Sequence, residues 1–89
     1  MNLNSLINTT LSEADGVFTL KNENTTLGFV RFNDFGEVEY IFVNPLFRKK
    51  KLAQNLLKLV RKKTQKKLTF QKPISPIGSI LLKSIKNWN

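Results

Sequence analysis

Residues 37–57 of this 89-residue chain read EVEYIFVNPLFRKKKLAQNLL and contain a strand, a break and the start of a helix. Residues 37–43 are rich in β-branched and aromatic side chains, which favour a strand. Pro45 ends that strand, because proline has no N–H group to donate to a β ladder. Apolar residues then recur at helical spacing and predict a helix from residue 51 or 52 to about residue 66. A basic loop at residues 46–50 joins the two elements.

The residues before this stretch predict two further strands. Residues 17–20 and 26–32 combine β-branched and aromatic side chains, and polar turn residues bound both segments. The loop at residues 33–36 contains a glycine suited to a hairpin with positive φ. Residues 1–12 are poorly defined, with apolar spacing that fits a short helix. We therefore expect three antiparallel strands ahead of the basic loop.

The residues after the central helix predict one strand and one helix. Residues 68–70 are apolar and lie between lysine-rich and proline-containing segments, which suits a buried strand. Ser75 followed by Pro76 is typical of a helix start, and the apolar spacing predicts a final helix that ends near Trp88. The central helix provides the crossover that a parallel pair of strands requires. The predicted fold is α+β, a single domain over residues 1–89 with a mixed, mostly antiparallel sheet of four or five strands and a helix on each face.

Composition excludes several classes of protein. A chain of 10.3 kDa has room for one small domain. The absence of Cys and His excludes disulfide scaffolds, zinc sites built on those residues and catalytic triads that use His, and we predict no metal site. No apolar run approaches the length of about 18 residues that spans a bilayer, and the first residues do not resemble a signal peptide. We therefore expect a cytoplasmic protein without membrane association.

The charges divide the chain into an acidic and a basic part. Residues 1–47 contain two bases and all six acids, whereas residues 48–89 contain thirteen bases and no acid, which gives the net charge of +9. A strong positive potential attracts anions such as phosphates. A lysine-rich composition on solvated surfaces gives the same pattern, so charge alone does not separate a functional basic site from a basic surface.

The junction at residues 43–53 has the features of a diphosphate site. The N-terminus of a helix offers unpaired N–H groups and the positive end of the helix dipole. Four consecutive basic residues precede or begin this helix: Arg48, Lys49, Lys50 and Lys51.

The same junction, VNPLFRKKKLA, resembles motif A of the GNAT acetyltransferase superfamily, which binds the pyrophosphate of acetyl-CoA. That motif reads V-x-P, two residues, then Q/R-x-x-G-x-G/A. Four residues match it (Val43, Pro45, Arg48 and Ala53), whereas Lys51 stands where the family usually has Gly. The strands at residues 26–32 and 36–43 and the segment 68–82 also resemble family elements, so the likeness covers about two-thirds of the chain.

The resemblance implies a small N-acetyltransferase that takes acetyl-CoA as cosubstrate and acetylates an amine on a protein or a small molecule. It implies that the backbone of Phe42 and Val43 pairs with the pantetheine amides of the coenzyme. It also implies that the loop and the first helical turn bind the pyrophosphate, through Arg48, Lys49, Lys50, Lys51, Leu52 and Ala53.

The resemblance further implies a catalytic role for Glu37, six residues before Val43, because some family members place a general base there. Glu39 follows at the two-residue spacing that keeps a side chain on one strand face. Solvated acids on a strand are the alternative interpretation of both residues. The family often has a Tyr acid in the last helix, but the only tyrosine here is Tyr40, in a predicted strand.

Three functional hypotheses follow from these observations. The first is the N-acetyltransferase, and the second is a catalytically degenerate relative that keeps the fold and acts as a binding or regulatory module. The third is a nucleic-acid binder that uses the basic half, although that half lacks interleaved aromatic residues for base stacking. The aromatic content and an open sheet edge also suggest a homodimer.

Overall fold

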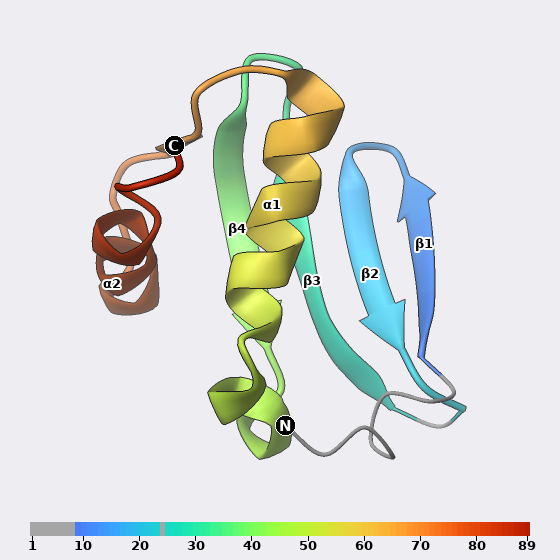
Figure 1. Ribbon diagram of the computed structural model, residues 1–89. Coiled ribbons are helices and arrows are strands. Elements are labelled where there is room, and N and C mark those ends of the chain that lie inside the picture. Colours follow the sequence, from blue (N-terminus) through green and yellow to red (C-terminus); the bar gives the residue numbers. More distant parts are fainter. Residues whose placement is uncertain (1–8, 24) are drawn as a thin grey trace.

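The computed structural model describes residues 9–23 and 25–89, which form a twisted sheet with two helices (Figure 1). A short 3-10 helix, η2, lies between the fourth strand and the first α-helix. The elements run in chain order as β1 (Thr10–Ala14), β2 (Val17–Lys21), β3 (Thr26–Phe32), β4 (Glu37–Val43), η2 (Pro45–Lys50), α1 (Leu52–Thr64), β5 (Thr69–Phe70) and α2 (Pro76–Ser84).

The five strands lie in the sheet in chain order, β1-β2-β3-β4-β5. The first four pair as antiparallel neighbours, and β5 pairs with β4 in parallel. Helix α1 connects β4 to β5, as a parallel pair requires. The α+β class with a mixed, mostly antiparallel sheet is therefore confirmed.

The first described strand corrects the prediction for the N-terminal segment. Residues 10–12, expected in a short helix, belong to β1, and residues 1–8 of that segment lie outside the described residues. Asp15 and Gly16 both have positive φ, 51° and 76°, and form a tight turn that returns the chain along β1. Strand pairing with β2 satisfies the backbone, and this tertiary gain overrides the weak helical spacing.

Both helices end earlier than predicted. Helix α1 stops before Gln65, because that residue adopts a left-handed conformation with φ 55°. Helix α2 ends at Ser84 rather than near Trp88, and the following residues form turns. The turns bring the Asn89 side chain to the backbone of Leu68, whose N–H donates to Oδ1 at 2.6 Å and whose carbonyl accepts from Nδ2 at 2.9 Å.

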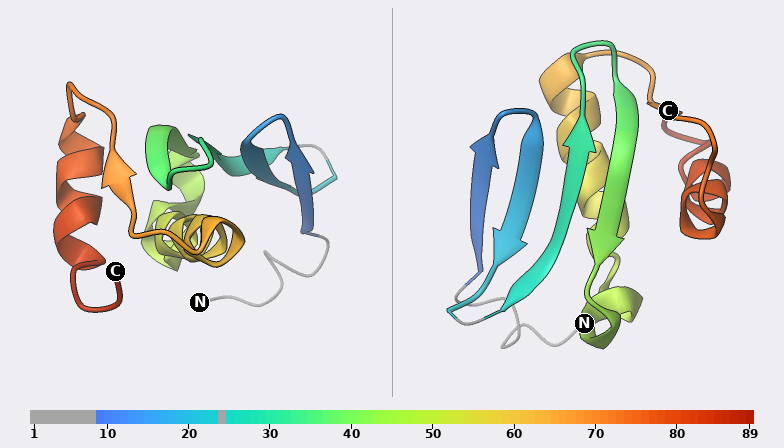
Figure 2. Two further views of the ribbon diagram at one scale, coloured as in Figure 1. Left: turned by 90° about the horizontal axis from the view of Figure 1, so that it is seen from above. Right: turned by 180° about the vertical axis from the view of Figure 1, so that it is seen from behind.

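The core lies on one face of the sheet, beneath α1. Its fully buried members include Val30 of β3, Leu56 and Val60 of α1 and Ile85, which follows α2. Because α2 contributes to this same cluster, it does not cover the other face of the sheet. The expectation of a helix on each face is therefore wrong for the described residues, in which no helix lies over the far side of β1–β4 (Figure 2).

The outward side of α1 is basic. Lys58, Lys62 and Lys63 are exposed, and the Lys63 ammonium lies 3.1 Å from the Glu13 carboxylate of β1. Among the described residues, no helix has the length and apolar character needed to cross a bilayer.

Candidate functional site

The two ends of β4 differ in their pairing. Strand β5 pairs with β4 only at Glu37 and Val38, and the next contact along this edge is the Gln71 N–H, which donates to the Val38 carbonyl at 2.8 Å. The chain then leaves the sheet and begins α2 at Pro76. Among the described residues, the stretch of β4 from Tyr40 to Phe42 therefore has a strand partner on the β3 side only.

A β-bulge lies where this pairing stops. In the β3–β4 ladder, Arg31 faces Tyr40 and Phe32 faces Val38, so Glu39 is an extra residue in β4. A bulge bends its strand and increases the local twist, which turns the second half of β4 away from β5. Bulges are frequent next to active sites for this reason.

A cavity of about 300 Å³ occupies the space between the diverging strands. Its walls combine apolar side chains with the polar groups of Glu39, Gln71 and Ser75. The Ser75 hydroxyl also accepts from the Gly78 N–H at 3.1 Å, which confirms the predicted cap of α2. Ten residues from β4, β5, the connection between β5 and α2, and the first turn of α2 line the cavity: Val38, Glu39, Tyr40, Ile41, Phe70, Gln71, Pro73, Ile74, Ser75 and Ile77.

Asn44 fixes the loop that follows β4. Its side-chain oxygen accepts from the Leu46 N–H at 3.0 Å, and its side-chain nitrogen donates to the Thr26 carbonyl at 3.3 Å. Its backbone N–H donates to the Leu27 carbonyl at 2.8 Å, and its carbonyl accepts from the Phe47 N–H at 2.8 Å. One residue thus ties the loop to β3 and caps the short helix η2.

The first turn of α1 begins without a side-chain cap, and its first two side chains pack inward. Lys51 precedes it in the left-handed conformation, with φ 58° and ψ 24°, and no side chain caps the helix. Leu52 is 2% exposed and packs with Leu27 and Val43, while Ala53 packs against the same cluster. Since their side chains point into the core, Leu52 and Ala53 can offer an anion only their N–H groups.

The left-handed backbone at Lys51 is a conformation that favours glycine. A residue with a Cβ atom pays a steric cost in this conformation, whereas glycine does not. The chain therefore has a left-handed turn before α1 even though the residue at this position is a lysine. Arg48, Lys49 and Lys50 lie in η2, directly before this turn, and the predicted roles of their side chains lie outside the described part of the structure.

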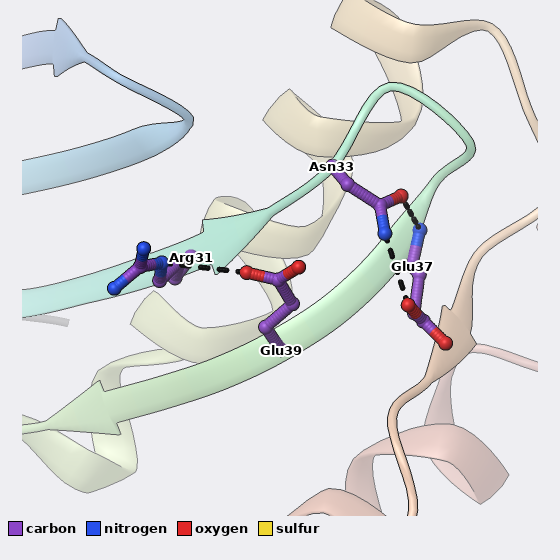
Figure 3. Close-up of polar contacts among 4 residues, drawn as sticks. All are labelled: Arg31, Asn33, Glu37 and Glu39. Atoms are coloured by element: carbon purple, nitrogen blue, oxygen red, sulfur yellow. Dashed lines mark hydrogen bonds and ion pairs between the residues drawn. The ribbon is translucent and has the colours of Figure 1, made fainter.

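Glu37 and Glu39 have different partners (Figure 3). The Glu37 carboxylate accepts from the Asn33 side chain at 2.9 Å, and the Glu37 N–H donates back to Asn33 Oδ1 at 3.2 Å. The Glu39 carboxylate lies 3.3 Å from Arg31 Nε. Of the two acids, Glu39 is among the residues that line the cavity, whereas Glu37 belongs to the hairpin end of β4.

The backbone groups of Phe42 and Val43 point to opposite sides of β4, and so do their side chains. The Phe42 carbonyl oxygen points toward β3, since an ideal Cβ on Gly28 would lie 2.7 Å from it. By strand alternation, the backbone groups that face the edge of the sheet belong to Ile41 and Val43. The Val43 side chain is buried, and the Phe42 ring lies on the uncovered face beside Phe29, with centroids 5.5 Å apart.

Sequence reasoning missed several residues of this region. Asn44 carries a signal that could have identified it, because an Asn directly before Pro is a favourable start for a helical turn. Gln71 and Ile74 carry none, because their place in the cavity depends on where the chain leaves β5. The bulge at Glu39 could not be predicted from the sequence either, since it appears only when β3 and β4 are placed in register.

Comparison with known proteins gives one match. The model of the acetyltransferase (GNAT) family matches residues 3–72, which is most of the chain. No curated protein and no solved structure matches it.

Proposed function

The chain belongs to the acetyltransferase (GNAT) family, and we propose that it is a cytoplasmic enzyme that transfers an acetyl group from acetyl-CoA to an amine. The observation that carries this proposal is a continuous arrangement along β4. The strand begins beside a cavity and ends, through the loop held by Asn44, at the N-terminus of α1. A long, narrow ligand with a diphosphate at one end suits such an arrangement.

The diphosphate is assigned to the start of α1. The N–H groups of Leu52 and Ala53 and the helix dipole supply fixed positive character, and Lys51 adds a charge beside them. The described first turn contains no acid that would oppose an anion. Three further bases of η2 belong to the proposed site: Arg48, Lys49 and Lys50.

The pantetheine arm is assigned to the open edge of β4. Its amides can pair with strand backbone as an added strand does, and Ile41 presents the edge-facing groups in this part of the strand, with Val43 two residues further along on the same side. Phe42 supports the same segment from the uncovered face, where its ring packs against Phe29. The thioester end then reaches the cavity between β4 and β5.

Glu37 and Glu39 are the two candidate bases. When bound, acetyl-CoA supplies the thioester whose carbonyl carbon an unprotonated amine can attack. Glu39 lines the cavity and can accept a proton there directly, whereas Glu37 is held by Asn33 and would need an intervening water. Tyr40 also lines the cavity and is 58% exposed, so its hydroxyl can donate a hydrogen bond to a leaving thiolate.

Calorimetric titration with acetyl-CoA, followed by assay of thiol release with a panel of amines, tests the proposal. We expect acetyl-CoA to bind and Arg48→Ala to weaken binding by about tenfold, the effect of losing one charge-assisted hydrogen bond. Lys86→Ala is the matched control, because it removes a charge from the distant end of the chain. Glu37→Gln and Glu39→Gln then show which acid turnover requires. Absence of acetyl-CoA binding at millimolar concentration would refute the proposal.

A catalytically inactive, coenzyme-binding relative is the second candidate function. Two observations favour it: Lys51 occupies a strained left-handed position, and residues 76–84 of α2 contain no tyrosine. The same experiments distinguish this function from the first, because such a protein would bind acetyl-CoA without releasing thiol in the presence of any amine.

A further inference from the structure

A second hollow, of about 510 Å³, lies on the face of the sheet opposite α1. It shares Glu39, Tyr40 and Gln71 with the cavity between β4 and β5, so the two spaces adjoin. We call this hollow the open-face groove. Six residues line it: Val17, Phe29, Arg31, Glu39, Tyr40 and Gln71.

The floor of the open-face groove is aromatic. The rings of Phe29 and Tyr40 stack with centroids 5.7 Å apart, and Phe42 extends the row on the other side of Phe29. Phe29 and Phe42 are half-buried, although the described residues place no helix above them. A row of aromatic rings that are only partly covered, next to polar groups, is typical of a surface that binds an apolar group.

One charged pair lies among these rings. Arg31 Nε and Glu39 Oε1 are 3.3 Å apart, and their side chains are 64% and 30% exposed (Figure 3). A ligand with a single charge is attracted by one member of the pair and repelled by the other, which lies beside it. A ligand with both charges can replace the pair, its carboxylate at Arg31 and its ammonium at Glu39.

We propose that the open-face groove binds an α-amino acid with an apolar side chain, which lies on the Phe29 and Tyr40 rings while its two charged groups engage Arg31 and Glu39. The proposal that the amino acid binds depends only on the residues that line the open-face groove. That the amino acid is also the acetyl acceptor rests on the proposed function, and Glu39 connects the two because it borders both spaces.

Acetyl transfer to this amino acid requires its ammonium group to lose two protons. The ammonium group first loses one proton to solvent, and the neutral nitrogen then attacks the thioester carbonyl carbon. A C–N bond forms and the C–S bond breaks. The nitrogen gives its second proton to the Glu39 carboxylate, which passes it to the leaving thiolate, so that one proton is released in total.

Three related compounds test the binding claim without acetyl-CoA: L-phenylalanine, phenethylamine and 3-phenylpropionate. Titrations followed by NMR through the ring resonances of Phe29 and Tyr40 report occupancy of the groove. We expect L-phenylalanine to bind about tenfold more tightly than either compound with one charge, because only it satisfies both members of the pair. Equal affinities, or no change at either ring, would overturn the proposal.

Variants at the pair separate charge recognition from general adhesion to the rings. Arg31→Gln should remove the preference for L-phenylalanine over phenethylamine, because these two compounds differ in the carboxylate. Glu39→Gln should remove the preference for L-phenylalanine over 3-phenylpropionate, because these two compounds differ in the ammonium group. Arg31→Lys should restore part of the first preference, since the charge returns without the planar fork. Lys62→Gln, on the outward side of α1, is the control and should change neither ratio. A preference that survives both neutral variants would contradict the assignment.

Thiol release with acetyl-CoA then tests the role as acceptor. Turnover that favours L-phenylalanine over phenethylamine in the wild-type chain, and loses this preference in Arg31→Gln, supports it. If acetyl-CoA binds but turnover favours amines without a carboxylate, the acceptor assignment fails while the proposed function stands. If acetyl-CoA does not bind, the proposed function and the acceptor role fail together, and the NMR titrations still decide the binding claim.

Discussion

The two faces of the sheet use similar side chains in opposite ways. On the face beneath α1, Val30 and Ile41 are buried among helix residues and hold the fold together. On the other face, Phe29 and Tyr40 belong to the same two strands but border a hollow. Alternation along the strands supplies apolar groups to both sides. Only a covering helix makes one set a core, and its absence among the described residues leaves the other set available to a ligand.

The faces also differ in their ion pairs. Glu13 and Lys63 connect β1 to α1 on the covered side, at 3.1 Å. Arg31 and Glu39 connect β3 to β4 on the uncovered side, at 3.3 Å, among aromatic rings. The first pair lies at the surface between two elements that the core already joins. The second borders the open-face groove, where the proposed ligand would replace it.

The largest expected difference between the faces is in packing. Leu56→Ala should lower the free energy of unfolding by about 2–5 kcal/mol, because the side chain is fully buried and its loss leaves a cavity. Tyr40→Ala, on the uncovered face, should cost about 1 kcal/mol or less. Urea denaturation of both variants measures the contrast. Equal losses would show that both faces are covered in solution.

Gly28→Ala tests how closely β3 and β4 approach beneath α1. The added Cβ would lie 2.7 Å from the Phe42 carbonyl oxygen and 3.4 Å from a Leu56 methyl group. We expect a loss of about 1–3 kcal/mol in the free energy of unfolding, because backbone must move to relieve the overlap. Thr19→Ala, in the neighbouring strand β2, is a control without such an overlap. A neutral Gly28→Ala variant would mean that the strands are farther apart than described.

Lys51→Gly tests the cost of the left-handed backbone directly before α1. Glycine adopts the left-handed backbone without the steric cost of a Cβ, so the free energy of unfolding should rise by about 1 kcal/mol. Thermal unfolding measures this gain. Lys58→Gly, inside α1, is the reverse control and should destabilise by a similar amount. If Lys51→Gly destabilises the protein, the left-handed turn is not its ground state.

The smallest expected effect concerns the ion pair on the covered side. Lys63→Gln removes the partner of Glu13, and both side chains are substantially exposed to water. Unfolding in urea should show a change of about 0.5 kcal/mol or less, and added salt should reduce it further. A change of several kcal/mol would indicate that β1 depends on this contact for its place in the sheet.

Local pattern predicted most of the elements of this fold. The strands at residues 26–32 and 37–43 and the start of the central helix at Leu52 are confirmed, because β-branched alternation, Pro45 and leucine spacing act over a few residues. The end of that helix and the strand at residues 10–14 were predicted incorrectly. A left-handed Gln65 and a pairing with β2 decide them, and neither is encoded by local spacing.

The candidate site, like the fold, was only partly predictable from the sequence. The motif from Val43 to Ala53 was visible in the sequence, because a strand, a proline and a basic helix start are consecutive in the chain. The cavity was not, since it joins Glu39 to Gln71 and Ile74 through tertiary contacts. Nor was the partner of each acid, because Asn33 and Arg31 reach Glu37 and Glu39 only after β3 pairs with β4.

The sequence by itself determined most of the strands and helices and where the basic turn before α1 begins, because those preferences act between near neighbours in the chain. Only the tertiary structure decided which face of the sheet lies beneath α1, where β4 parts from β5 and which acid borders the resulting cavity. These features depend on residues far apart in the sequence, and the bulge at Glu39 changes which side chains share a face without any change in local preference.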